Sequence, residues 1–239
     1  MSDLLRIGLG AAAAAVAGAA GYTVGAYAVT EGLSVGVVKR GPARPMVALT
    51  FDDGPDPEYT PRILDALAAA GVHASFFMVG SRAEAAAAAA RAVAAAGHDV
   101  GNHTYSHRHL WGLSPAATVA EVDRGAAAIA AVTGIVPLYF RPPWGTFNWA
   151  AYLRAAQIGE RRVLWSVRPE GFFVVASCSR MTELVVRRAH PGAIINLHDR
   201  GGHPSTPRVT WSALPGMIAG LRARGFEIVR LQVLLAGSV

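Results

Sequence analysis

Short apolar runs alternate with longer alanine-rich runs along most of this chain, and this alternation constrains its fold more than any other feature. Apolar runs bounded by turn residues are typical of buried strands, whereas runs dominated by alanine, the best helix former, are typical of helices. Strands are predicted at residues 47–51, 74–79, 99–101, 138–141, 163–167, 193–197 and 226–231. Helices are predicted at residues 61–70, 81–96, 115–133, 148–156, 181–189 and 212–224.

Repeated strand–helix units with apolar strands predict a parallel sheet. With about seven such units, we expect an α/β fold with a distorted (β/α) barrel of about seven parallel strands. An open, doubly wound sheet is the alternative. The folded domain is expected to cover residues 45–235, a length that suits a single domain. Residues 31–44, in which glycine and proline break any periodicity, are predicted to be a linker.

The segment before the linker is hydrophobic, since residues 7–29 carry no charged side chain. As a helix, it is long enough to cross a bilayer core of about 30 Å. Residues 1–30 are therefore predicted to be an uncleaved signal anchor that contacts the membrane through residues 7–29. A cleaved signal peptide is one alternative, because Ala17 and Ala19 are small residues at suitable spacing. In another, the segment packs on the domain or stays disordered, because alanine and glycine favour membranes only weakly.

Charge and cysteine content narrow the possible partners and cofactors. The chain has 22 Lys and Arg against 16 Asp and Glu, and the net charge of +6 favours anionic surroundings such as lipid headgroups or acidic glycans. Nucleic acid is not expected as a partner, because the basic residues are scattered and no nucleic-acid motif is present. The single Cys178 excludes an intrachain disulfide and argues against a cysteine-based metal site.

Polar side chains gather directly after five of the predicted strands. These clusters are Asp52-Asp53, His103 with His107, Arg141-Pro142-Pro143-Trp144, Arg168-Pro169-Glu170 and His198-Asp199. In a parallel barrel, the carboxyl ends of all strands open on one face, and that face carries the active site. We therefore expect the five clusters to converge on one cleft.

Two of the clusters together predict a metal site. His103 and His107 are four residues apart, so on a helix they would share a face and could bind one ion. Zinc sites often combine two histidines with one carboxylate. Asp52 and Asp53 are adjacent carboxylates, which is costly unless something neutralises them. A metal would bind one while the other stays free as a base; alternatively, Asp-Asp-Gly-Pro forms only a turn and the histidines are a surface pair.

The chain resembles the polysaccharide deacetylase family, also called the NodB-homology domain or carbohydrate esterase family 4. The resemblance covers roughly residues 44–235. It rests on four motifs in this order: Thr50-Phe51-Asp52-Asp53-Gly54-Pro55, His103-Thr104-Tyr105-Ser106-His107, Arg141-Pro142-Pro143-Trp144-Gly145 and Leu197-His198-Asp199. It implies a distorted barrel, a divalent metal that is usually Zn²⁺, and hydrolysis of N-acetyl or sometimes O-acetyl groups on chitin-like, peptidoglycan or xylan chains.

The resemblance also implies roles for single residues. Asp52 corresponds to the catalytic base and His198 to the catalytic acid. The metal ligands would be Asp53, His103 and His107. Arg141 would orient the base. Pro143 and Trp144 would line the substrate groove, and Leu197 would lie beside the acetyl methyl group. The backbone N–H of Trp144 would also stabilise the oxyanion. Two of these helpers have structural alternatives, since Arg141 could form only an ion pair and Trp144 could be core.

The segment after the fifth predicted strand departs from the family pattern. Arg168 and Gly171 stand where the family usually has acids, and Phe172 stands where it usually has tryptophan. We hypothesise that Glu170, the only carboxylate left in this segment, takes the role of the acid that tunes the catalytic histidine. Arg168 could instead contact an acidic group of the substrate. Otherwise the protein works without the tuning acid, or works slowly.

These observations predict a metal-dependent hydrolase that removes N-acetyl groups from the amino sugars of a polysaccharide. One alternative keeps the chemistry and changes the substrate to a lipid-linked glycan that is deacylated or deformylated. Another is a non-catalytic glycan-binding module on the same scaffold. The protein is expected to be a monomer, anchored to a membrane or secreted, with its catalytic domain outside the cytoplasm.

Overall fold

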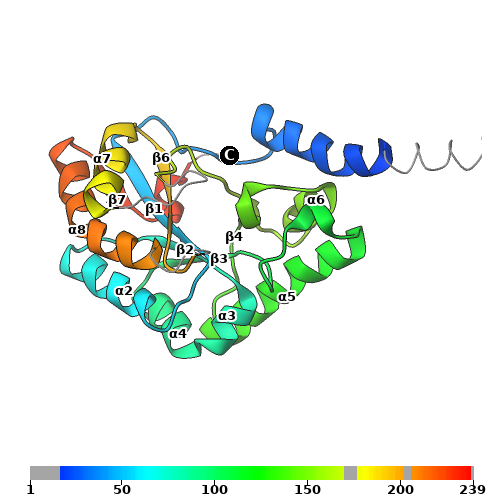
Figure 1. Ribbon diagram of the computed structural model, residues 1–239, viewed down its shortest axis with the longest axis horizontal. Helices are drawn as coiled ribbons and strands as arrows, with labels where there is room; N and C mark the ends of the chain where they lie inside the picture. The colour runs from blue at the N-terminus through cyan, green and yellow to red at the C-terminus, as the bar shows by residue number, and fades with distance from the viewer. Residues whose placement is uncertain (1–16, 170–176, 202–205, 238–239) are drawn as a thin grey trace, which may run out of the picture.

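The computed structural model describes residues 17–169, 177–201 and 206–237. Within them, seven parallel strands form one sheet in the order β5-β4-β3-β2-β1-β6, and β7 pairs with the start of β1. The helices pack around this sheet (Figure 1). The strands are β1 (Met46–Asp52), β2 (Ser75–Met78), β3 (Asp99–Asn102), β4 (Tyr139–Phe140), β5 (Arg161–Arg162), β6 (Ala193–His198) and β7 (Glu227–Val229). The predicted α/β class is confirmed.

The two edges of the sheet approach each other. Val167, which follows β5 in the chain, forms a parallel bridge to Ile195 of β6 at the opposite edge. The backbone N–H of Asn196 donates back to the carbonyl of Val167. The sheet therefore curls into the predicted distorted (β/α) barrel rather than staying open.

Helices connect successive strands, as the alternation predicted. They are α2 (Tyr59–Ala69), α3 (Gly80–Ala85), α4 (Ala87–Ala95), α5 (Pro115–Thr133), α6 (Trp149–Gln157), α7 (Cys178–Arg188) and α8 (Thr206–Ala223), with short 3-10 turns η3 (Leu110–Gly112) and η4 (Pro143–Gly145). A short helix, α9 (Leu231–Leu234), follows the last strand. Helix α5 shows why the ends of a helix could be predicted from the sequence. Ser114 caps its N-terminus, Pro115 follows at the first helical position, and Gly134 ends it at a φ of 73°.

Several predicted elements differ in the structure. The helix predicted at residues 81–96 is two helices, because Ala86 leaves the helical conformation. The strand predicted at 163–167 is wrong: β5 lies at Arg161–Arg162, and the later segment forms only isolated bridges. Helix α8 begins at Thr206, earlier than predicted, and residues 231–234 are helical. Alanine content alone cannot show where a run must bend to fit the barrel.

Side chains of the central strands alternate between the barrel interior and the helix layer. In β1, Leu49 and Phe51 pack in the large core beneath the helices, whereas Ala48 packs with interior residues. Asp52 has the same parity as Ala48, so it belongs to the interior side. This alternation decides which residues at the strand ends can reach the mouth of the barrel.

The described part of the N-terminal segment is helical and lies against the domain beside α6 (Figure 1). It contains η1 (Gly21–Gly25) and η2 (Ala28–Gly32). The Trp149 indole N–H donates to the carbonyl of Gly21 over 3.0 Å, and Ala26 is fully buried. No helix in the described ranges is long and apolar enough to cross a membrane. The membrane prediction for residues 7–29 lies partly outside these ranges, because they begin at residue 17.

The predicted linker at residues 31–44 also contacts the barrel. Val38 forms a parallel bridge to Val163, and Arg40 forms an antiparallel bridge to Ala193. Lys39 forms an ion pair of 2.9 Å with Glu31. The segment thus runs along the domain as a paired strand-like stretch.

Candidate active site

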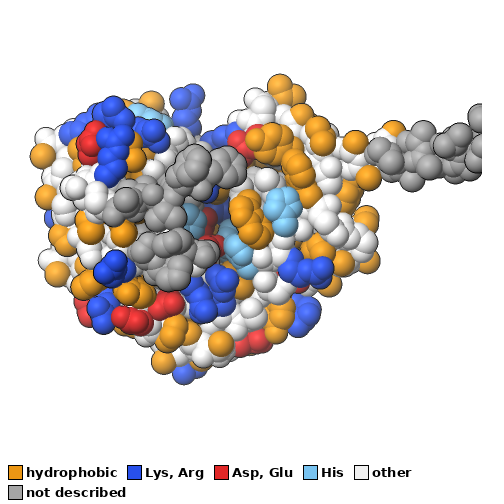
Figure 2. All heavy atoms as spheres, in the orientation of Figure 1, with side chains coloured by type: hydrophobic (Ala, Val, Ile, Leu, Met, Phe, Trp, Pro, Cys, Tyr) orange, Lys and Arg blue, Asp and Glu red, His pale blue; other side chains and the backbone are white. Residues whose placement is uncertain are grey.

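The carboxyl ends of β1, β3, β4 and β6 bring the predicted clusters to one face of the barrel. Asp52 is the last residue of β1 and lies opposite His198, the last residue of β6. His103 directly follows β3, and Arg141 directly follows β4, which pairs with β3. On this face, histidine, acidic and hydrophobic side chains surround a hollow (Figure 2).

The three predicted metal ligands lie together. The Oδ1 atom of Asp53 is 2.8 Å from Nε2 of His107 and 3.3 Å from Nε2 of His103. All three ligand atoms lie within 4.8 Å of one another. The Nδ1 atom of His103 is 2.6 Å from the carbonyl oxygen of Arg141, which leaves Nε2 directed at the other two ligands. Two imidazole nitrogens and one carboxylate oxygen are a donor set that fits zinc.

The protonation states of this site suit metal binding. Burial raises the pKa of Asp53, but hydrogen bonds from His103 and His107 outweigh it and hold that pKa well below its usual value. Burial lowers the pKa of His107. At neutral pH, the carboxylate is therefore ionised and His107 is neutral, and these are the forms that ligate a metal ion.

The histidines do not lie on a helix, so the shared-face argument for their spacing is wrong. They lie on the loop between β3 and η3, where Thr104 has a φ of 68° and His107 a φ of 57°. Such left-handed conformations are uncommon for residues other than glycine and are held by their surroundings. Here Glu121 of α5 accepts hydrogen bonds from the backbone N–H and the hydroxyl of Ser106. The loop turn brings the two rings together.

Asp52 is buried and held at both oxygens. Arg141 Nη1 donates to Oδ1 over 2.6 Å, and Asn196 Nδ2 donates to Oδ2 over 2.6 Å. Arg141 is itself fully buried and donates to the Thr50 hydroxyl and to the carbonyls of Val163 and Leu164. The guanidinium is thus directed at protein acceptors, and it positions Asp52 rather than reaching into the hollow.

Asn196, which precedes Leu197 on β6, was missed by sequence reasoning. Strand β6 alternates, so Asn196 lies on the same side as His198, whereas Leu197 is fully buried in the core that contains Phe51. The predicted position of Leu197 beside the acetyl methyl group stays a prediction. The signal for Asn196 was present in the sequence, as the only polar residue within the predicted strand at 193–197.

Trp144 lies at the surface of the site and not in the core. Its side chain is 52% exposed, and its ring lies 4.7 Å from the ring of His107. Pro143, the preceding residue, is buried. Trp144 has a φ of 56°, which turns the chain outward at this point. The ring therefore forms one wall beside the metal ligands.

Of the predicted cluster Arg168-Pro169-Glu170, the structure describes Arg168 and Pro169. Arg168 is half-buried, and its guanidinium carbon lies 5.6 Å from the ring of Trp165. The same ring lies 5.5 Å from the guanidinium carbon of Arg141. Glu170 lies outside the described residues, so its proposed tuning of His198 stays a prediction.

Asp199 is a further carboxylate next to His198. It is buried, accepts a hydrogen bond of 2.5 Å from the Thr60 hydroxyl, and burial raises its pKa to about 7. A Cβ atom at Gly54 would lie 2.1 Å from Asp199 Oδ2, so only glycine fits there. The turn after the paired aspartates thus packs directly on this carboxyl group.

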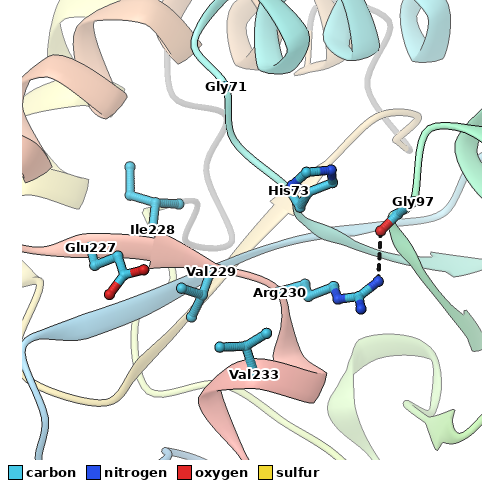
Figure 3. A pocket seen from close by; sticks show the side chains of 8 residues that line it. All are labelled: Gly71, His73, Gly97, Glu227, Ile228, Val229, Arg230 and Val233. Carbon is cyan, nitrogen blue, oxygen red and sulfur yellow. Dashed lines mark hydrogen bonds between the residues drawn. The ribbon is translucent and has the colours of Figure 1, made fainter.

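A separate cavity of about 500 Å³ lies at the other end of the sheet (Figure 3). It is lined by residues that include His73, Glu227 and Arg230. Glu227 pairs with Met46 at the start of β1, which places the cavity at the amino end of the strands. Arg230 there donates to the carbonyl of Gly97 over 2.8 Å. None of the predicted site residues lines this cavity.

Comparison with known proteins agrees with the geometry. The family model for polysaccharide deacetylase matches residues 39–163. A peptidoglycan-N-acetylglucosamine deacetylase of Bacillus cereus is 34% identical over 191 residues, which cover 80% of this chain and 88% of the relative. A chitooligosaccharide deacetylase of Bradyrhizobium is 36% identical over 193 residues, which cover 76% and 87%. Among solved structures, a carbohydrate esterase family 4 pseudoenzyme from Bacillus anthracis superposes with a TM-score of 0.75 at 28% identity, covering 83% of this chain and 68% of that one.

Proposed function

Because this chain belongs to the polysaccharide deacetylase family, we propose that it is a metal-dependent hydrolase that removes N-acetyl groups from the amino sugars of a peptidoglycan or chitin-like polysaccharide. One observation carries the proposal. The three ligand atoms of Asp53, His103 and His107 lie within 4.8 Å of one another, at the end of the strand that also carries the buried Asp52. A ligand set beside a positioned carboxylate is what hydrolysis of an amide requires.

Asp53, His103 and His107 would hold the metal, and Zn²⁺ suits their donor atoms best. When bound there, the metal lowers the pKa of water and polarises the acetyl carbonyl. The hydrogen bond between His103 Nδ1 and the carbonyl of Arg141 leaves the Nε2 atom of that ring free to serve as a ligand.

Asp52 acts as the general base. Arg141 and Asn196 each hold one of its oxygens at 2.6 Å, so the carboxylate meets the attacking water in one orientation. It accepts the proton that this water loses as the oxygen attacks the acetyl carbon. The backbone N–H of Trp144 would donate to the oxyanion that develops on the carbonyl oxygen.

His198 acts as the general acid. It lies opposite Asp52 in the register of β1 and β6, so the two groups flank the same space at the mouth of the barrel. Donation of a proton to the amine nitrogen lets the C–N bond break, because an amine anion would be a poor leaving group. Acetate and the free amino sugar are the products.

A non-catalytic glycan-binding module is the second candidate. The scaffold occurs in a pseudoenzyme, and the segment after the fifth predicted strand departs from the family pattern at Arg168. Against this reading, Asp52 and His198 lie opposite each other in the sheet register, and the ligand atoms of Asp53, His103 and His107 lie within 4.8 Å of one another. A lipid-linked sugar as substrate and a domain outside the cytoplasm stay predictions.

The test is release of acetate from chitooligosaccharide and from peptidoglycan by zinc-loaded protein. We expect Asp52→Asn to lower kcat about 100-fold or more, because a general base contributes about 10²- to 10⁴-fold, while one zinc per chain still binds. Asp65→Asn, an exposed aspartate on α2, is the matched control and should keep full activity. If zinc-loaded protein releases no acetate from either substrate yet binds glycan, the hydrolase proposal fails and the module is favoured.

A further inference from the structure

A continuous row of aromatic rings runs from the metal ligands to the N-terminal helix. The ring of Trp144, beside His107, lies 5.1 Å from the ring of His109. His109 in turn lies 5.7 Å from Trp111. The ring of Trp111 lies 5.7 Å from the ring of Tyr27, which belongs to the N-terminal segment, and the two rings meet at an interplanar angle of 90°. Three separate parts of the chain thus contribute to one row.

These rings stay accessible although they are fixed in place. Trp144 is 52% exposed and Tyr27 is 42% exposed, and His109 is exposed as well. The Trp111 indole N–H donates to the carbonyl of Phe147 over 2.9 Å, and its backbone N–H donates to Nδ1 of His109. Trp111 is half-buried, and an aromatic side chain that is held by a hydrogen bond loses little further freedom when a ligand packs on it.

The N-terminal helix is held so that Tyr27 keeps its position. Ala26, the preceding residue, is fully buried in the cluster that contains Phe140, and Trp149 donates to the carbonyl of Gly21. Thr30 is fully buried one turn later. Tyr27 is therefore a fixed part of this face and not the tip of a free tail.

We propose that His109, Trp111 and Tyr27 form a distal subsite for the same amino-sugar chain whose reacting sugar lies at the metal site. The inference rests on the proposed function. Pyranose rings present C–H groups on their faces, and aromatic rings with one polar edge are suited to such surfaces, which are part apolar and part wet. Because the row starts at the metal ligands, one extended glycan chain can occupy the metal site and the distal subsite together. The N-terminal helix thereby belongs to the substrate-binding surface.

The subsite predicts a dependence on substrate length. On zinc-loaded full-length protein, kcat/KM is measured for the hexamer and the dimer of N-acetylglucosamine. Tyr27→Ala and Trp111→Ala should each lower the hexamer-to-dimer ratio about three- to tenfold, the effect expected for loss of one aromatic contact. Tyr27→Phe, which keeps the ring, should retain the ratio of the unmodified protein. Leu153→Ala, which removes an exposed apolar side chain on α6 outside the row, is the control and should change neither rate.

Binding decides the inference independently of catalysis. In the Asp52→Asn background, the Kd for the hexamer should rise about three- to tenfold when Tyr27→Ala is added. An unchanged Kd together with an unchanged ratio would overturn the subsite. So would binding of these rings to phosphatidylglycerol vesicles with no binding of the hexamer. If no acetate is released at all, the proposed function fails, and the binding series still decides whether the subsite exists.

Discussion

Asp52, Arg141 and Asn196 form a buried network in which a charge pair and an amide depend on one another. Arg141 is fully buried, so its charge is tolerated only because Asp52 and several neutral acceptors surround it. Among the described residues, Asn196 supplies the one hydrogen bond to the Oδ2 atom of Asp52. Removing one member leaves another buried and unsatisfied, which costs more than the lost bond itself.

Asn196→Ala should therefore impair both stability and catalysis. We expect the free energy of unfolding to fall by about 1–3 kcal/mol, because Asp52 Oδ2 loses its donor. We expect kcat to fall about tenfold or more with KM little changed, because the freed carboxylate no longer meets water in one orientation. Urea denaturation and steady-state kinetics measure the two effects.

Asn196→Asp places a second carboxylate against Asp52 and should shift the acid limb of the pH–rate profile to higher pH. An unshifted profile would argue against the contact.

At the scale of elements, helix α5 supports the loop that carries the histidines. Gly125 of α5 packs so closely on this loop that a Cβ there would lie 2.4 Å from Asn102 Oδ1 and 2.7 Å from the backbone carbon of Thr104. Glu121, one turn earlier, holds Ser106. The metal site therefore depends on how near the helix comes to the loop as well as on the ligands.

Gly125→Ala should weaken metal binding. Alanine in a helix normally stabilises by up to about 1 kcal/mol relative to glycine, so a loss of zinc affinity would come from displacement of the loop and not from the helix. We expect an increase in the zinc Kd of about tenfold or more, measured by competition with a chelator. Gly216→Ala in α8 is the control, since its Cβ would lie 3.4 Å from Thr182, an ordinary contact. Equal zinc affinity in both variants would contradict the argument.

At the scale of the whole molecule, the site is tied to distant elements through buried polar groups. Glu160 precedes β5, is 3% exposed, and accepts hydrogen bonds from Asn102 at the end of β3. Burial raises the pKa of Glu160 to about 8, with the hydrogen bond from Asn102 acting in the opposite direction. A carboxyl group that keeps its proton in the folded protein and loses it on unfolding makes the stability of the whole domain depend on pH.

The sign of this pH dependence follows from the raised pKa of Glu160. Between about pH 4.5 and 8, the unfolded chain ionises Glu160 while the folded protein holds the proton, so this group's contribution to the free energy of unfolding falls as pH rises. Glu160→Gln removes the effect. Its advantage over the unmodified protein should grow by up to about 1.4 kcal/mol per pH unit across this window. Urea denaturation at pH 5, 6.5 and 8 measures it. The exposed Glu227→Gln should show no such trend, and parallel curves for Glu160→Gln would refute the prediction.

Much of the fold was predictable because a few neighbouring residues mark where a helix begins and ends. Helix α5 matched its predicted bounds, since Ser114, Pro115 and Gly134 mark its ends through local backbone chemistry. The short strand at β5 was misplaced, because the segment around Val167 is apolar whether it pairs regularly or forms a single bridge. For the N-terminal segment the sequence left the alternatives open, because an uncharged alanine-rich run fits both a bilayer and packing on the domain; its described part lies beside α6 (Figure 1).

The sequence alone determined which residue types stand at the strand ends: Asp52, Asp53, His103, Arg141 and His198 follow apolar runs whose parallel pairing must bring them to one face. Only the tertiary structure decided how they meet. The phase of β6 turns Asn196 inward and Leu197 outward, and the register of β1 and β6 sets Asp52 opposite His198. A loop with left-handed residues, rather than a helix, closes the histidines on Asp53. The physical reason is that propensity and alternation act over a few neighbouring residues, whereas these contacts join residues as far apart as Asp52 and Asn196.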